Sequence, residues 1–364
     1  MSTSISGFSS IHQLAKRLEQ DIARRRLRSN DRYLTAAEAG KLLGVSRATA
    51  DRALKILADN QLVTRRQNLG TFVRTPPVAT TDVKIRTVHV LIPAELEFDP
   101  FVCSNRMVEG IRKQIRDVNV QFSFIPRGMG VGYVEKLIAS SSSDRELVGV
   151  VAVSCSREVY HFLAESGVPT VVFGSLYPSE PAMPSVDLDN HEAGRLLARY
   201  IVDRGHRRIG YLFAADGRPG ANAFYDGISE VLTEARLPHN ALMVRLMPPD
   251  IPTFSAAARD LLQIPDRPTA FITQGQYLAD LISSVTSELG LKVPADLDIV
   301  FADNATAETE DSPFAHVQGK VCFEETVALI GRMIYRLSRG QSLEEENVVV
   351  PVVLRDAKSV SGID

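Results

Sequence analysis

The sequence has few cysteines and no long apolar run. Three cysteines, Cys103, Cys155 and Cys322, lie far apart among 364 residues, so we expect no disulfide framework and a cytoplasmic location. No stretch of about 18 consecutive apolar residues is present, which excludes a membrane-spanning helix. Residues 1–10 lack the apolar core of a secretory signal, so no signal peptide is expected.

Signatures of catalysis and metal binding are also lacking. The run Gly-Met-Gly-Val-Gly at 128–132 lacks the Lys-Ser/Thr of a P-loop and the spacing of GxGxxG, and we expect a flexible loop there. There is no Gly-x-Ser-x-Gly elbow and no nucleophile with its base. Asp187, Asp189 and His191 are close in sequence, but no third cluster accompanies them. We therefore expect no enzyme, no cofactor and no metal.

The composition is that of an ordinary globular protein, but the charge is uneven. With 45% hydrophobic and 23% charged residues, the length predicts two or three domains. Residues 1–77 hold 14 Lys and Arg against 6 Asp and Glu, and the remainder holds 27 against 38, so a head of net charge +8 precedes a body of −11. A basic head is typical of a nucleic-acid-binding module, although a short window can also be basic by chance.

The head predicts three helices. Apolar residues at helical spacing predict an amphipathic helix over about 9–26. Thr35 and Glu38 form a capping box for a short second helix that ends near Gly44, and Ser46 caps a third. The expected buried face of this third helix has four apolar residues: Ala50, Ala53, Leu54 and Leu57. Two short helices joined by residues 43–46 make a helix-turn-helix.

Two β-rich segments follow, at 62–66 and 71–74, and predict a hairpin, or wing, in which Gly70 supplies a positive φ. The third helix would present its N-terminal end to the major groove of DNA. Arg47 and Arg52 could reach guanine or phosphate there. A solvated charged face on an ordinary helix is the alternative.

The head resembles that of a known family. Residues 42–54, Leu-Leu-Gly-Val-Ser-Arg-Ala-Thr-Ala-Asp-Arg-Ala-Leu, with 62–66 and Gly-Thr-Phe-Val at 70–73, resemble the winged helix of GntR-type bacterial transcription regulators. The resemblance covers about residues 10–74 and implies double-stranded operator DNA as a partner. Ala37 stands where many members have an Arg, so one family contact is missing. The implied DNA-binding residues are Ser46, Arg47, Thr49, Arg52, Arg66, Gln67 and Gly70.

A Pro- and Thr-containing linker, within residues 75–86, separates the head (1–74) from the body (87–364). Expected strands of the body lie at 88–92, 120–125, 147–153, 169–173, 208–213, 242–246, 270–273 and 298–302. Expected helices include 105–117, 191–204, 221–235 and 278–289. This alternation predicts parallel sheets covered on both faces, in two doubly wound lobes. The fold class is therefore an α+β winged helix-turn-helix followed by an α/β body.

Five motifs of the body resemble a second family. The segments 186–194, 204–212, 268–273, 289–294 and 298–304 resemble, in that order, the effector-binding domain of LacI-type regulators, which is similar to type I periplasmic binding proteins. This implies dimerisation through the body and three crossovers between a first lobe (about 87–187 and 314–343) and a second (about 188–313 and 344–358). The chain would cross back at 314–318, add a first-lobe helix at about 324–339, and end in the second lobe at 348–354.

The same resemblance implies a small-molecule effector between the lobes. Phe224 stands where the family usually has an Arg, and Gln276 stands where it has an Asp, so neutral groups replace two charged ones and a less usual effector is expected. Phe224 could instead simply pack between the lobes. The implied effector-binding residues are Asp99, Phe101, Ser154, Arg218, Phe224, Asp250, Gln276 and Asp303. His206 is expected to orient a helix-to-strand turn.

Together, these features predict a homodimeric, ligand-responsive transcription regulator, with a repressor favoured over an activator. A solute-binding receptor is the second hypothesis, and the basic head argues against it. The third is an enzyme, because GntR-type heads also occur fused to aminotransferase-like bodies. Such a body needs a Schiff-base lysine in a recognisable pocket, and no catalytic set is present here.

Overall fold

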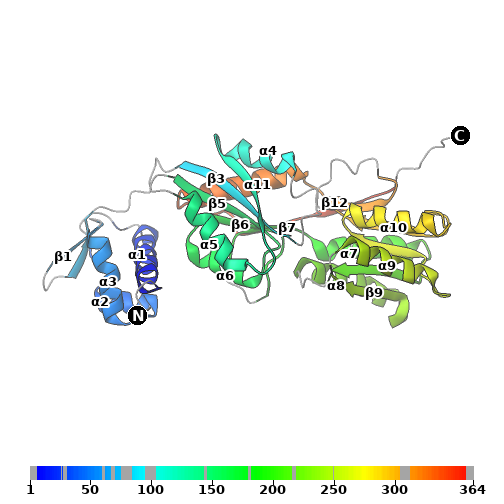
Figure 1. Cartoon of the computed structure of the whole chain (residues 1–364), viewed down its shortest axis with the longest axis horizontal. Coiled ribbons are helices and arrows are strands. Elements are labelled where there is room, and N and C mark those ends of the chain that lie inside the picture. Colours follow the sequence, from blue (N-terminus) through cyan, green and yellow to red (C-terminus); the bar gives the residue numbers. More distant parts are fainter. Residues whose placement is uncertain are drawn as a thin grey trace. The chain divides into compact units, whose positions relative to one another are not determined.

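The computed structural model describes residues 6–25, 27, 31–59, 62–66, 70–74, 84–94, 104–142, 146–178, 182–214, 219–248, 250–303 and 312–357. The chain divides into two compact units, Met1–Lys84 with Arg339–Ser342, and Ile85–Ser338 with Leu343–Asp364. We describe them one at a time, as a head and a body (Figure 1). None of the helices within the described ranges is long and apolar enough to cross a membrane.

The head has the expected winged helix-turn-helix. Its elements are α1 (Ser6–Arg24), α2 (Ala36–Leu43), α3 (Arg47–Asp59), β1 (Val63–Arg66) and β2 (Gly70–Val73). The strands β1 and β2 are antiparallel, and Gly70 has a φ of +109°. The capping box of α2 is formed, since the Thr35 backbone N–H donates to Glu38 Oε2 at 2.7 Å and the Glu38 N–H donates to Thr35 Oγ1 at 3.3 Å.

The core of the head forms where α1 and α3 meet. The expected apolar face of α3 is fully buried, as are Leu18 and Ile22 of α1. The Tyr33 hydroxyl group lies 3.0 Å from both the Leu18 carbonyl oxygen and Asp21 Oδ2. These contacts join α1 to the segment before α2, so the three helices form one packed unit.

The first lobe of the body is a six-stranded sheet with helices on both faces. Its strands, in the order β13-β7-β6-β5-β3-β4, are β13 (Asn347–Val350), β7 (Ser185–Leu188), β6 (Thr170–Phe173), β5 (Glu146–Val153), β3 (Lys84–Pro93) and β4 (Asn119–Ile125). Apolar side chains of α4 (Asn105–Gln114) and α11 (Phe323–Ser338) join one core cluster. Those of α5 (Gly130–Ser141) and α6 (Arg157–Ser166) join another.

The second lobe repeats this plan. Its strands, in the order β14-β12-β11-β10-β8-β9, are β14 (Val352–Arg355), β12 (Ala315–Gly319), β11 (Asp298–Ala302), β10 (Ala270–Gln274), β8 (Ile209–Ala214) and β9 (Leu242–Met247). The helices α7 (Asn190–Asp203) and α8 (Pro219–Glu234) cover one face, and α9 (Ile251–Gln263) and α10 (Gln276–Glu288) cover the other. The two doubly wound lobes are thus confirmed, with β14 as an antiparallel edge strand.

The crossovers differ in place from the expectation. Residues 315–319, expected to lie in the first lobe, form β12 of the second sheet, and residues 347–350, expected in the second lobe, form β13 of the first. Pro351 separates β13 from β14, and an apolar run of this kind does not reveal which sheet edge it joins. The Asp189 N–H donates to the Val350 carbonyl at 3.0 Å and the Lys320 N–H to the Pro351 carbonyl at 2.7 Å, so the three crossovers are bonded to one another.

The expected loop at 128–132 is wrong, because α5 begins at Gly130. The buried side chains of Val134 and Ile138 give this helix an apolar face against the first sheet. Burial of that face outweighs the low helix propensity of the two glycines in its first turn.

Candidate functional site

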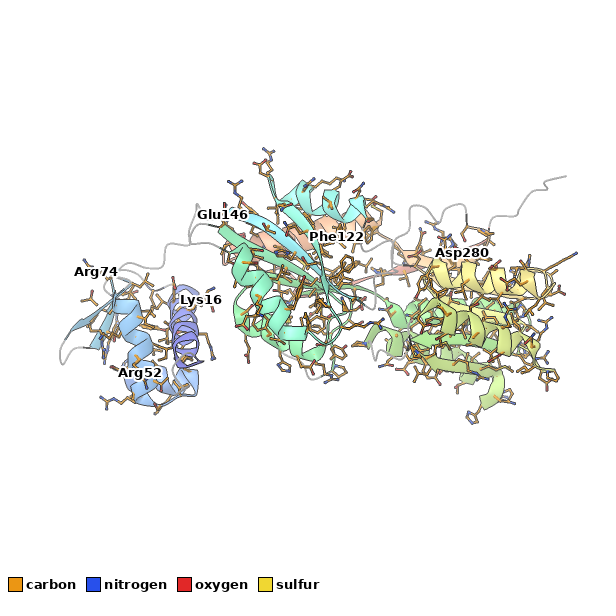
Figure 2. The ribbon with its side chains drawn as sticks, in the orientation of Figure 1. Lys16, Arg52, Arg74, Phe122, Glu146 and Asp280 are labelled. Carbon is orange, nitrogen blue, oxygen red and sulfur yellow. The ribbon has the colours of Figure 1, made fainter. Side chains whose placement is uncertain are left out.

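The N-terminal end of α3 carries a cluster of polar and basic side chains. Ser46, Arg47 and Arg52 are exposed, Thr49 is half-buried, and Arg52 is labelled on α3 in Figure 2. Ser46 Oγ accepts a hydrogen bond from the Thr49 N–H at 3.2 Å and lies 2.9 Å from Thr49 Oγ1, so the expected cap is confirmed. The opposite face of α3 is in the core, and the helix is therefore held with this end outward.

The wing is tied to α3 by an ion pair that the sequence did not reveal. Arg65 of β1 donates to the carboxylate of Asp51 on α3. Arg66 is the last residue of β1 and pairs with Gly70 of β2, but its side chain and the whole of Gln67 lie outside the described residues.

Three of the expected effector residues follow strands of the second lobe. Asp250 precedes α9, and its Oδ1 accepts from the Thr253 N–H at 2.9 Å. Hydrogen bonds from the side chain and the backbone N–H of Thr253 hold the pKa of Asp250 below its usual value, and the charge of Arg127 in the first lobe lowers it further. Gln276 opens α10 and is half-buried, while Asp303 follows β11 and is 4% exposed. All three lie where the parallel strands end, at the edge where such sheets bind ligands.

In the first lobe, Ser154 follows β5, is half-buried, and has a φ of +46°. Positive φ is uncommon for a residue other than glycine and is concentrated at functional sites. The other expected residues of this group, Asp99 and Phe101, and Arg218 of the second lobe lie outside the described residues.

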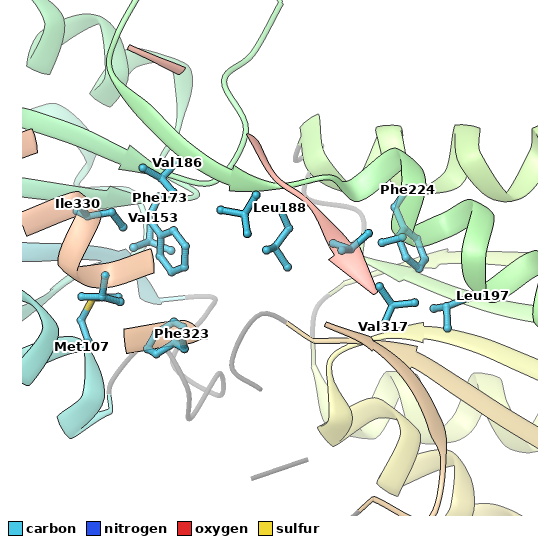
Figure 3. Close-up of a cluster of buried hydrophobic side chains, with 14 of the residues drawn as sticks. Met107, Val153, Phe173, Val186, Leu188, Leu197, Phe224, Val317, Phe323 and Ile330 are labelled. Carbon is cyan, nitrogen blue, oxygen red and sulfur yellow. The ribbon is translucent and has the colours of Figure 1, made fainter. Parts of the chain in front are cut away.

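Phe224 corrects the expected effector set, because its side chain is fully buried in the core. Its ring centroid lies 5.9 Å from that of Tyr211, and Figure 3 shows it among the buried apolar side chains near Leu197 and Val317. The ring offers no surface to a ligand in this conformation. The alternative of a packing role is the one the structure supports, within the second lobe.

His206 has the structural role expected of it. Its Nδ1 lies 2.9 Å from Thr269 Oγ1 and its Nε2 lies 2.9 Å from Asp298 Oδ2. The hydrogen bond from His206 lowers the pKa of Asp298. The side chain thus joins the end of α7 to the starts of β10 and β11. Within the described ranges, no group of three or more His, Cys, Asp or Glu residues is placed to hold a metal ion.

Comparison with known proteins agrees with both halves of this architecture. Residues 11–73 match the family of bacterial regulatory proteins named gntR, and residues 179–359 match the periplasmic binding protein-like domain. The chain thus joins a head similar to the gntR family to a body similar to the periplasmic binding protein-like domain. The match to the head ends at Val73, the last residue of β2, and the match to the body begins at residue 179, shortly before β7.

Two relatives that this chain matches over more than 80% of its length are transcription regulators by name. An arabinose metabolism transcriptional repressor of Geobacillus stearothermophilus is 24% identical over 313 residues, which is 82% of each chain. Among solved structures, a transcriptional regulator CelR–cellobiose complex has a TM-score of 0.63 and 20% identity, over 90% of this chain and all of that one. The lac repressor dimer bound to operator has a TM-score of 0.61 and 18% identity, over 76% and 94%. At these identities the structures show the fold alone.

Proposed function

We propose that the protein is a transcription repressor whose affinity for operator DNA is controlled by a small molecule bound between the two lobes of its body. The observation that carries the proposal is the presence of a gntR-family head and a periplasmic binding protein-like body in one chain. The first supplies a DNA-binding module and the second a fold that closes on ligands. A regulator of this kind acts on the chromosome, so we place it in the cytoplasm.

The contact to DNA is proposed to come from Ser46, Arg47, Thr49 and Arg52 of α3, with Arg66, Gln67 and Gly70 at the wing. The support is the outward N-terminal end of α3, since this end of a recognition helix enters the major groove. Arg47 and Arg52 are exposed, and Arg52 Nε donates to the carbonyl oxygen of Ala48 on the same helix at 3.5 Å. From this end of α3 the two guanidinium groups could reach bases or phosphates.

Selection of genomic DNA by the purified protein tests the function. We expect a few palindromic sites to be enriched, whereas equal recovery of all sequences would contradict the proposal. Arg47→Ala is expected to weaken binding to a selected site by about 1–3 kcal/mol, a loss of roughly 5- to 150-fold, while binding to unrelated DNA changes far less. An equal loss on both DNAs would make Arg47 a phosphate contact. The exposed Lys136 on α5 gives a matched control, Lys136→Ala.

The effector is proposed to be a sugar or sugar-like molecule bound by Asp99, Ser154, Arg218, Asp250, Gln276 and Asp303, with Phe101 as an apolar wall. The support is their place after the carboxyl ends of the strands and the binding protein-like fold. A thermal-shift screen of sugars, sugar acids and nucleosides tests this, because a ligand of the folded body raises its melting temperature by mass action. A hit whose shift survives Gln276→Ala and Asp303→Asn would contradict this assignment of the site.

The active form is proposed to be a homodimer joined through the body. A groove of about 360 Å³ between α9 and α10 is lined by Ile251, Ser255, Tyr277, Leu281, Ser284, Val285 and Glu288. Ile251 is 45% exposed, and Leu246 of β9, the strand before α9, is 62% exposed. Exposed apolar surface of this kind is typical of an interface, and a dimer would place two heads on a palindromic operator.

A further inference from the structure

A half-buried carboxylate lies at the first crossover between the lobes, outside the expected effector set. Asp187 is the third residue of β7, the strand from which the chain passes to the second lobe. Ser175, which follows β6 of the first lobe, donates a hydrogen bond to Asp187 Oδ2. Asn190, the first residue of α7, donates from Nδ2 to the same oxygen at 2.9 Å, and the Leu188 N–H donates to Oδ1 at 2.8 Å. One side chain thus bonds to groups on both sides of the crossover.

The charge of Asp187 is compensated without a cationic side chain. Within the described part of the chain, no Lys, Arg or His forms an ion pair with it, and burial raises the pKa of Asp187 above its usual value. A carboxylate that has lost part of its hydration is stabilised where dipoles or hydrogen bonds replace the lost water. Two helices of the second lobe, α7 and α8, begin beside it, and the N-terminal end of a helix carries partial positive charge.

The start of α8 packs directly on the donors that hold Asp187. A Cβ atom built on Gly220, the second residue of α8, would lie 3.0 Å from Ser175 Oγ and 3.0 Å from Asn190 Nδ2. A side chain at this position would make Ser175, Asn190 or α8 shift by a few tenths of an ångström. The glycine therefore allows the first turn of a second-lobe helix to rest against a first-lobe side chain.

We propose that Asp187 is a positioning residue of the effector site, which holds Ser175 of the first lobe against Asn190 and the first turn of α8 of the second. The helix α8 is the next described element after β8, whose carboxyl end lies at the edge where such sheets bind ligands, so the orientation of α8 shapes that edge. Only the assignment of Asp187 to an effector site rests on the proposed function. The arrangement of Asp187, Ser175, Asn190 and Gly220 is a property of the body alone.

Hydrogen exchange measured by mass spectrometry on the full chain, without DNA or effector, tests the inference. Asp187→Asn keeps the size of the side chain and removes its charge, and places an amide donor among existing donors. We expect exchange over residues 219–226 to become about tenfold faster. Asp203→Asn, an equal change of charge at the exposed far end of α7, should leave these residues as in the wild type. Ser175→Ala should act like Asp187→Asn, and Ser175→Thr, which keeps the hydroxyl group, should restore the slow exchange.

The inference is overturned if Asp187→Asn leaves residues 219–226 unchanged, if Asp203→Asn has the same effect, or if Ser175→Thr fails to restore protection. Should Asp187→Asn speed exchange throughout the second lobe, Gly220→Ala decides, because it crowds Ser175 Oγ and Asn190 Nδ2 at the start of α8 while the carboxylate remains. Local acceleration in Gly220→Ala then supports the inference, and a uniform effect contradicts it. The exchange experiment contains no DNA, so its outcome does not depend on operator binding. A failed operator selection would therefore contradict the proposed function and would not change the exchange result.

Discussion

Arg106 and Glu324 join the first helix of the first lobe to its last. Arg106 donates through Nη2 to Glu324 Oε2 at 2.8 Å and through Nε to Oε1, and the two side chains are 18% and 27% exposed. The guanidinium group also lies 5.6 Å from the centroid of the Phe323 ring. Two parallel hydrogen bonds in a partly buried pair are among the stronger polar contacts in proteins.

This pair makes the stability of the body depend on pH in a defined window. The hydrogen bonds from Arg106 lower the pKa of Glu324 to about 2. The folded-state pKa of Glu324 lies below the unfolded value of about 4.3. The pair therefore adds to the free energy of unfolding above pH 4.3, and this contribution is lost as the pH falls toward 2. We expect Glu324→Gln to be less stable by up to about 3 kcal/mol at pH 7 and by much less at pH 2.5.

Urea unfolding of the two proteins across this range measures the difference. Glu344→Gln is the control, since this carboxylate also accepts from an arginine but its side chain is 89% exposed, and exposed pairs contribute little. If the free energies of unfolding of Glu324→Gln and the wild type differ by the same amount at every pH, the ionised Glu324 side chain is not the source of the stabilisation.

The helices α7 and α8 approach so closely that two positions require glycine. A Cβ on Gly194 of α7 would lie 2.1 Å from the Phe224 carbonyl oxygen, and one on Gly227 of α8 would lie 2.1 Å from the His191 carbonyl oxygen. Both neighbours are backbone atoms, which cannot move aside as the end of a flexible side chain can.

Gly194→Ala is therefore expected to destabilise the body by about 1–3 kcal/mol or more, because the two helices must separate. Gly132→Ala is a matched control: it lies in the first turn of α5, with nothing within 4 Å of its built Cβ. Alanine favours helix over glycine, so this control should be neutral or slightly stabilising. Thermal unfolding of both variants makes the comparison, and equal melting temperatures would show that the close approach has no energetic weight.

At the scale of the whole chain, the sequence predicted the modules and the expected strands from residue 88 to 302 well, because apolar runs between amphipathic helices leave few alternatives. The places where it was wrong depend on long-range contacts. The sheet that receives β12 or β13 is decided by pairing partners far along the chain, and Phe224 is buried against residues of other elements, such as Tyr211 of β8. The sequence around Asp187 suggests only a metal ligand, since nothing near it in sequence indicates Ser175 or Gly220 as neighbours.

Oligomeric state is the property that most directly links the body to DNA binding. If the groove between α9 and α10 joins two copies, Ile251→Arg replaces an apolar contact with a long charged side chain in the interface and should convert the protein to a monomer in sedimentation at micromolar concentration. Ile264→Arg is the control, because Ile264 is also an exposed apolar residue, 38% exposed, at the other end of α9 and outside the groove.

The same two variants connect assembly to operator binding. A monomer presents one head to a palindrome, so Ile251→Arg should lose most of the affinity for a selected site while each head keeps its contact to a half-site. Ile264→Arg should bind like the wild type. A protein that stays dimeric with Ile251→Arg would place the interface elsewhere on the body, and a monomer that binds the full site with unchanged affinity would show that the two heads act independently.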